Sequence, residues 1–170
     1  MLLVVLRTDV QVSGGNGSPR PVMREKTIDP SASEKKVDTD WRIVSININN
    51  FPTEKDGHDK AKLDLLRETI HASGAEIIGI SEMGRNENNL PFQKRPSNVT
   101  KAWVENGSSI ASWNQRHHSN SVEPGGVLML TKDRCTAHTI KKGKDERNLG
   151  LWTWMTVKVK QNLTTTIITT

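Results

Sequence analysis

The chain lacks several features that define common protein classes. It contains one cysteine, Cys135, which excludes an internal disulfide and fits a reducing, intracellular compartment, either nucleus or cytoplasm. It contains no tyrosine, and only 34% of its residues are apolar, against roughly 45–50% in typical globular chains when glycine is counted. The apolar opening at residues 1–6 is too short to cross a membrane or to form the core of a secretion signal. These absences argue against a disulfide-bonded secreted protein and against a membrane partner.

Part of the apolar deficit lies in residues 10–40, which are rich in Ser, Gly, Pro and charged residues and show little hydrophobic periodicity. Such a segment buries too little apolar surface to offset the loss of chain entropy on folding. We therefore predict a disordered N-terminal extension over residues 1–40, in which the opening apolar run is at most a stray short strand. Residues 41–170 are expected to belong to a single domain.

Two short apolar runs, residues 42–48 and 76–83, dominate the pattern of the remaining chain. Their β-branched residues predict strands that are buried on both faces. Between them, a helix is expected from about Asp59 to Ser73, stopped by Gly74. The apolar face of that helix is formed by Leu63, Leu66 and Ile70. The order strand, crossover helix, strand predicts a parallel pair whose carboxyl ends meet at one edge of a sheet.

Polar residues stand where these two strands end. Asn47 closes the first strand and Glu82 closes the second. Ligands bind at such an edge in α/β folds, and a carboxylate and a carboxamide there can handle a metal ion or a phosphate. Asn49, one side-chain alternation beyond Asn47, is expected to point the same way.

The motifs SININNF and GAEIIGISEM resemble the opening of the endonuclease/exonuclease/phosphatase superfamily, the deoxyribonuclease I-like proteins, and in particular its retrotransposon-type endonucleases. Asn47 matches the Asn of the first motif, and Glu82 matches the Glu of the second, with Ser81 where the family often has Gln. Residues 125–130 are similar to a glycine-led strand of the family. Residues 145–152 are similar to a segment that often ends Gly-Arg-Trp, with Leu151 in place of the Arg. The resemblance implies an α+β fold, a four-layer α/β/β/α sandwich.

The C-terminal residues predict a hairpin and an incomplete domain. Two β-rich runs, 151–160 and 163–169, flank a turn at Gln161 and Asn162. The later family motifs, Asp-x-Asn and Ser-Asp-His, are absent, as is the tyrosine- or histidine-bearing loop before them. The chain is therefore expected to be the N-terminal portion of the domain, truncated at its C-terminus, with weak activity or none.

By resemblance, the parent activity is the Mg²⁺-dependent hydrolysis of phosphodiesters, with DNA as the favoured substrate and Mn²⁺ as a possible substitute ion. Glu82 would be catalytic and a metal ligand, Asn47 would orient a phosphate, water or histidine, and Asn49 would lend a carbonyl to the metal. A phosphatase of inositol lipids or nucleotides stays open. So does a catalytically inactive remnant that binds polyanions, because the net charge is +5.

Three other polar residues are interpreted as loop residues rather than as site residues. Glu87 is expected in a solvated loop. His117 and His118 are adjacent, without the i, i+4 spacing or the carboxylate partner that a zinc site on a helix would need.

Overall fold

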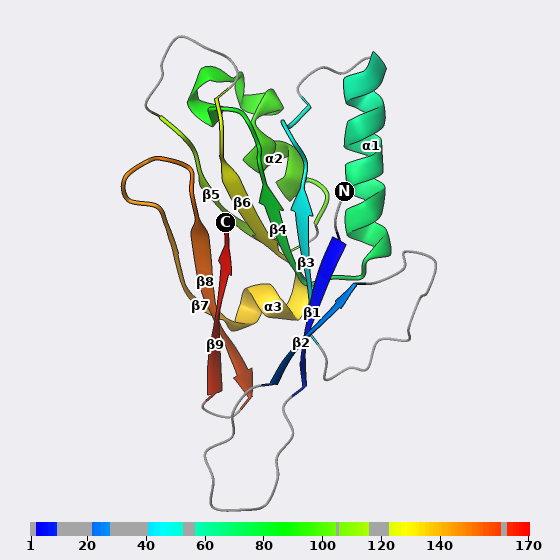
Figure 1. Cartoon of the computed structure of the whole chain (residues 1–170), viewed down its shortest axis with the longest axis vertical. Coiled ribbons are helices and arrows are strands. Elements are labelled where there is room, and N and C mark those ends of the chain that lie inside the picture. The colour runs from blue at the N-terminus through cyan, green and yellow to red at the C-terminus, as the bar shows by residue number, and fades with distance from the viewer. Residues whose placement is uncertain are drawn as a thin grey trace, which may run out of the picture.

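The structure is a computed structural model that describes residues 3–9, 22–27, 41–52, 57–104, 106–115, 123–160 and 163–170. Within these ranges the chain has an α+β fold with a larger mixed sheet, a smaller antiparallel sheet and three α-helices (Figure 1). None of the described helices is long and apolar enough to cross a membrane.

The larger sheet has the strand order β2-β1-β3-β4-β6-β5. Strands β3 and β4 are parallel, and every other neighbouring pair is antiparallel. The six strands are β1 (Leu3–Asp9), β2 (Val22–Thr27), β3 (Arg42–Asn47), β4 (Ile77–Ser81), β5 (Ser108–Ser112) and β6 (Val127–Thr131). The smaller sheet has the order β7-β8-β9, with β7 (Thr139–Lys144), β8 (Thr153–Lys160) and β9 (Leu163–Thr169).

The predicted strand–helix–strand unit is confirmed. Helix α1 (Gly57–Ala72) connects β3 to β4, and its apolar stripe faces the sheet, with Leu66 and Ile70 buried. Gly74 ends the helix with a φ of 58°, a left-handed conformation that glycine adopts without steric cost. The other helices are α2 (Pro96–Lys101) and α3 (Asp133–His138), and two 3₁₀ turns, η1 (Glu87–Asn89) and η2 (Phe92–Lys94), precede α2.

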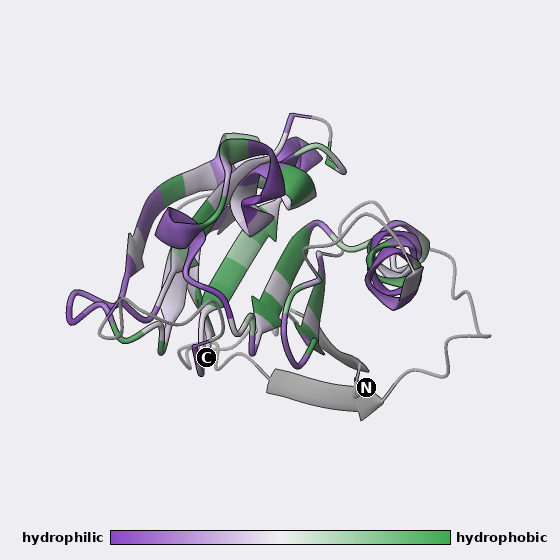
Figure 2. Ribbon diagram, turned by 90° about the horizontal axis from the view of Figure 1, so that it is seen from above, coloured by the Kyte–Doolittle hydropathy of each residue, from purple (hydrophilic) through white to green (hydrophobic). Residues whose placement is uncertain are grey.

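The larger sheet carries a core on each face, because successive side chains of a strand point to opposite faces. One core lies between this sheet and helices α1 and α2, and the other lies between this sheet and the smaller sheet (Figure 1). In β4, Ile78 and Ile80 join the helix-side core, whereas Ile77 joins the sheet-side core. All five residues of β4 are therefore buried, as expected of a strand covered on both faces. Figure 2 shows the same arrangement from above, with the apolar strands at the centre and α1 seen end-on to one side.

The N-terminal forty residues depart from the prediction of disorder in two places. Strand β1 pairs antiparallel with β3 and with β2, so strand pairing extends across the boundary expected at residue 41. The physical reason is that the apolar, β-branched opening run meets the main-chain donors and acceptors that β3 would otherwise leave unpaired at its edge. The other residues before Trp41 lie outside the described ranges, and for them the expected disorder stays a prediction.

The predicted C-terminal hairpin is confirmed, because β8 and β9 pair antiparallel over most of their length. The two sheets meet closely where this hairpin crosses β4. A Cβ atom added at Gly79 would lie 2.6 Å from Oγ1 of Thr169, so only glycine leaves room for β9 here.

Candidate active site at the carboxyl ends of β3 and β4

Asn47 and Glu82 lie at the same edge of the larger sheet, as the sequence predicts. Asn47, the last residue of β3, is the register partner of Ser81, the last residue of β4, and Glu82 follows directly. The main-chain N–H of Ile48 donates to the carbonyl of Ser81 at 3.2 Å, which extends the pairing past the strand end. Both side chains are exposed to solvent. An amide and a carboxylate are therefore available side by side on two neighbouring strands.

Glu82 has a strained backbone. Its φ is +56°, a left-handed conformation that costs a non-glycine residue roughly 1–2 kcal/mol. The surrounding main chain holds this conformation in place. The carbonyl of Glu82 accepts the N–H of Asn50 at 2.7 Å, and the N–H of Met83 donates to the carbonyl of Gly126 at 3.0 Å. Within the described part of the chain the Glu82 carboxylate has no hydrogen-bond partner. Strained residues of this kind concentrate at functional sites, which makes Glu82 a site candidate on geometry as well as on sequence.

The Asn47 side chain folds the turn that follows β3. Its Oδ1 accepts the main-chain N–H of Asn49 at 3.1 Å, an Asx turn. The amide oxygen therefore has a local structural task, and Nδ2 is the group of Asn47 that can donate to a ligand.

Asn49 does not lie where strand alternation would put it. Strand β3 ends at Asn47, and the backbone of Asn49 is left-handed with a φ of 43°. The argument that Asn49 points the same way as Asn47 is therefore wrong, because alternation applies only within an extended strand. The Asn49 side chain is exposed, and its proposed metal contact stays a prediction.

A lysine from α1 holds this strand-end turn. Lys62 Nζ donates to the carbonyl of Asn49 at 2.8 Å and to that of Asn50 at 2.7 Å. Burial lowers the pKa of the Lys62 ammonium below its ordinary value of 10.5, Asp59 opposes this effect, and Arg85 adds to it. Arg85 itself donates from Nε to the carbonyl of Phe51 at 3.4 Å. Two basic side chains thus stand at the edge that carries Glu82.

Sequence patterns did not single out Lys62 or Arg85 as site residues. In the sequence, Lys62 is one of the polar residues outside the apolar stripe of the helix, and its position early in the helix, after the strand-end turn, is the signal that could have found it. Arg85 stands three residues after Glu82, outside the matched motif. Contacts between main-chain carbonyls and side chains from a different element leave no regular spacing in the sequence.

Glu87 is not in a solvated loop. It is half-buried, and its carboxylate accepts the Trp113 indole Nε1–H at 3.1 Å, the main-chain N–H of Ser97 at 2.8 Å and the Ser97 hydroxyl. These bonds tie the turns after β4 to α2 and to Trp113. Glu87 is thus a structural residue. The pair His117 and His118 lies outside the described residues.

Asp145 also has a structural task, in the segment that resembles the Gly-Arg-Trp motif. Its carboxylate accepts main-chain N–H groups of Arg147 at 2.9 Å, Leu149 at 3.0 Å and Leu151 at 3.4 Å. Burial alone would raise the pKa of the Asp145 carboxyl, but these three N–H groups and the Arg147 charge hold it below its ordinary value. The Leu151 side chain is exposed, so the position of the family's Arg is occupied by an apolar group facing solvent.

Glu123 is a further carboxylate residue near this edge that sequence patterns did not reveal. Its main-chain N–H donates to the carbonyl of Gly84 at 3.1 Å, two residues after Glu82. The side chain is only 2% exposed, and among the described residues neither carboxylate oxygen has a hydrogen-bond partner. A buried, unpaired carboxylate is rare in proteins. Because the group is closed off from solvent, we do not assign it to metal binding.

The donors at this edge fit one kind of metal site. Within the described residues no three His, Cys, Asp or Glu side chains gather in a group that could hold a metal ion by themselves. Glu82 offers one accessible carboxylate, which fits Mg²⁺, since that ion commonly takes one or two carboxylates and completes its shell with water and substrate phosphate. A zinc-like site closed by protein ligands does not fit.

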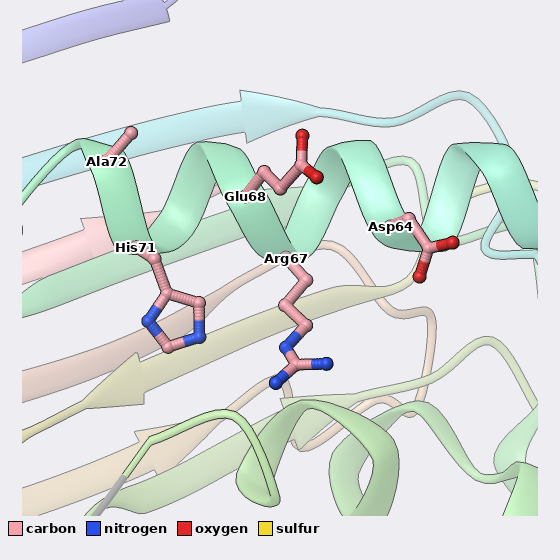
Figure 3. A pocket seen from close by; sticks show the side chains of 5 residues that line it. All are labelled: Asp64, Arg67, Glu68, His71 and Ala72. Carbon is pink, nitrogen blue, oxygen red and sulfur yellow. The ribbon is translucent and has the colours of Figure 1, made fainter.

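A surface hollow of about 500 Å³ lies elsewhere, along α1 (Figure 3). It is lined by Asp64, Arg67, Glu68, His71 and Ala72, all from that one helix. It shares no residue with the strand ends, and its two carboxylates outnumber its one guanidinium, which disfavours a phosphate there, so it gives no alternative location for the site.

Comparison with known proteins assigns no family. The chain matches no protein-family model, and no curated protein matches it significantly. The function proposed below therefore depends on the strand-end geometry and on the motifs in the sequence.

Proposed function

We propose that this chain is part of a Mg²⁺-dependent phosphodiesterase of the endonuclease/exonuclease/phosphatase type, with DNA as the favoured substrate. The observation that carries the proposal is the parallel pairing of β3 and β4. It brings the exposed Asn47 amide and the exposed Glu82 carboxylate to one edge of the sheet, with Glu82 in a strained backbone conformation. This is where the sequence motifs require the two residues to meet.

The residues at the edge have separable tasks in phosphodiester hydrolysis. Glu82 would hold Mg²⁺, or Mn²⁺ in its place, and the bound ion would offset negative charge that builds up on the phosphoryl oxygens. Asn47 Nδ2 donates to a phosphate oxygen and fixes the orientation of the diester. Lys62 and Arg85 add positive potential beside the turn, which attracts a polyanion. Asn49, whose side chain is exposed, would lend its side-chain carbonyl to the metal.

The finer fold belongs to the same proposal. Three layers are described, namely the helices α1 and α2, the larger sheet and the smaller sheet. A fourth, helical layer would cover the outer face of the smaller sheet. Apolar side chains on that sheet support this, because Ile140 is 51% exposed and Ile168 is 64% exposed, and a covering layer would bury them.

A non-catalytic polyanion-binding protein is the second candidate. The net charge of +5 and the two cations beside the strand ends favour it, because each neutralised phosphate releases counterions whether or not it is cleaved. A phosphatase of inositol lipids or nucleotides would use the same phosphate contacts, and the difference lies in which substrate is cleaved.

The test combines metal binding with cleavage. Mn²⁺ is titrated into the ¹⁵N-labelled chain. Because Mn²⁺ is paramagnetic, we expect the amide NMR signals around Asn47 and Glu82 to broaden first. The substitution Glu82→Gln should abolish this local broadening, and Glu146→Gln, at an exposed carboxylate on the turn between β7 and β8, should not. Supercoiled plasmid is then incubated with Mg²⁺, and we expect slow nicking that is lost in Glu82→Gln and kept in Glu146→Gln.

Two outcomes would overturn the proposal. Nicking that survives Glu82→Gln would remove this edge from the chemistry. Salt-sensitive plasmid binding without Mn²⁺ broadening and without nicking would favour the polyanion-binding alternative. Cleavage of an inositol phosphate or a nucleotide in preference to DNA would keep the site and change the substrate.

A further inference from the structure

An exposed aromatic ring stands on the segment that follows β4. Phe92 is 65% exposed, the most exposed large apolar side chain among the described residues. It belongs to the 3₁₀ turn η2, ten residues after Glu82. In Figure 1 the turns after β4 lie at the end of the sheet toward which β3 and β4 point. The ring is therefore available to a ligand at this end of the sheet.

The turn that carries Phe92 is fixed by hydrogen bonds. The Phe92 carbonyl accepts Asn98 Nδ2 at 2.9 Å, and Arg95 Nε donates to the carbonyl of Leu90 at 3.2 Å. Glu87 binds Ser97 and so ties the start of the segment to α2. The ring is therefore held out from a rigid support, which lowers the conformational entropy that a binding partner must offset.

A guanidinium group lies over the Phe92 ring. The Cζ atom of Arg95 is 5.9 Å from the centroid of the Phe92 ring, within cation–π range. Residues 90–101 contain three basic residues, Lys94, Arg95 and Lys101, and no acidic one. An aromatic face with a planar cation next to it, on a basic segment, is the combination that stacks nucleobases and neutralises the phosphates between them.

We infer that Phe92 and Arg95 form a stacking contact for an unpaired nucleobase. That base belongs to the nucleic-acid strand whose phosphate reaches the sheet edge at Glu82. The inference rests on the proposed function, because it assumes a nucleic-acid substrate. It adds a base contact that is independent of the metal and of hydrolysis. A single-stranded or locally opened substrate fits better than an intact duplex, since a base inside the duplex has no free face to stack on the ring.

The test measures binding without cleavage. Fluorescence anisotropy is recorded with the whole chain, in EDTA, on a labelled single-stranded oligothymidylate. We expect Phe92→Ala to weaken binding about tenfold, within the range found for loss of one base–aromatic stack. Phe92→Trp should restore it. Ile168→Ala, an equally exposed apolar side chain on β9, is the matched control and should bind as the wild type does.

A second ligand separates stacking from charge. On an abasic oligomer of the same length, wild type and Phe92→Ala should bind equally, because no base is present to stack. Arg95→Gln should flatten the salt dependence by about 0.7 in the slope of log K against log salt, as loss of one phosphate contact on a single strand does. Phe92→Ala should leave that slope unchanged.

Loss of binding by Phe92→Ala that is equal on both oligomers, or no loss at all, would overturn the inference. If Phe92→Ala alters the self-association of the chain but not its DNA binding, the ring belongs to a protein contact instead. Because the assay contains no metal, failure of both the Mn²⁺ and the nicking tests refutes only the proposed function, and absence of a Phe92 effect refutes only the stacking contact.

Discussion

Strand β4 is flanked by a glutamate at each end, and the two glutamates have opposite environments. Glu76, just before the strand, is 2% exposed, and its Oε1 lies 2.6 Å from Nε of Arg134. Glu82, just after the strand, is exposed, has a left-handed backbone, and finds no side-chain hydrogen bond within the described residues. One carboxylate joins α3 to the sheet, and the other is free for a ligand. Both residues are glutamates that stand directly next to an end of β4, so the packing of neighbouring elements determines which of them is buried.

The comparison shows what each end of the strand needs. At the Glu76 end, Lys132 donates its N–H to the carbonyl of Glu76 at 3.0 Å, and α3 begins at the next residue, which closes the end from water. A carboxylate there requires a cation, because an unpaired buried charge is costly. At the Glu82 end, the turns that follow β3 and β4 leave the Glu82 side chain exposed to solvent, where a carboxylate needs no partner.

The largest expected effect is on the thiol packed beside the Glu76 end. Burial, and then the Glu76 charge, raise the pKa of the Cys135 thiol from 9.0 to about 12, although Arg134 opposes this. At pH 8 its thiolate fraction is then about a thousandfold below that of a free cysteine, and the thiolate is the reactive form. We expect iodoacetamide to label the folded chain about a thousandfold more slowly than the urea-unfolded chain, as followed by mass spectrometry.

The same thiol contributes a pH dependence. Its folded pKa is raised, so its contribution to stability is complete below pH 9.0 and is lost as the pH rises toward about 12. Urea midpoints measured from pH 8 upward should fall in the wild type and fall less in Cys135→Ala. Rapid labelling of the folded chain would show that this end of the strand is open, and the contrast with Glu82 would disappear.

The second effect is the loss of the buried ion pair. We expect Glu76→Ala to lower the free energy of unfolding by about 2–3 kcal/mol, somewhat less than for breaking a fully buried pair because Arg134 is 34% exposed. Urea denaturation followed by tryptophan fluorescence measures this. Glu82→Ala is the matched control and should change stability by less than about 0.5 kcal/mol. Equal losses in the two variants would mean that both glutamates are structural.

The elements that form these two ends differ in how well they can be predicted from the sequence alone. Strong periodic signals predicted β3, α1, β4 and the β8–β9 hairpin, because burial of apolar residues determines these elements directly. Strands β5 and β7 were not predicted, since Ser108–Ser112 and Thr139–Lys144 are mostly polar and pair because neighbouring strands offer them main-chain partners. Likewise, Asn47 and Glu82 were found from strand ends and motifs, whereas Lys62 and Glu123 came to light through contacts between distant segments.

A third carboxylate sharpens the comparison, because Asp145 is buried without a cation as its main partner. Three main-chain N–H groups satisfy it, and we expect Asp145→Ala to cost about 1–3 kcal/mol by leaving those donors unpaired. Its pKa is lowered on folding, so its contribution is complete above its ordinary pKa of 3.8 and is lost as the pH falls through the lower folded value. Stability measured from pH 5 downward should show this acid loss in the wild type, and the loss should be smaller in Asp145→Asn. If Asp145→Asn loses as much stability below pH 5 as the wild type does, other carboxyl groups cause that loss.

The smallest expected effect has the opposite sign and concerns Glu82. Glycine adopts a φ of +56° without the penalty of roughly 1–2 kcal/mol that a side chain incurs, although it loses about 0.5–1 kcal/mol through the greater freedom of the unfolded chain. We therefore expect Glu82→Gly to raise the free energy of unfolding by about 0.5–1 kcal/mol, measured by urea denaturation beside Glu82→Ala, which keeps the strain. Both variants should lose the Mn²⁺ response, so a more stable chain would bind metal less well. That is the signature of a residue kept for its chemistry at the expense of stability. If Glu82→Gly proves no more stable than Glu82→Ala, the backbone is not strained there, and the argument for this end of β4 reduces to exposure and sequence motif alone.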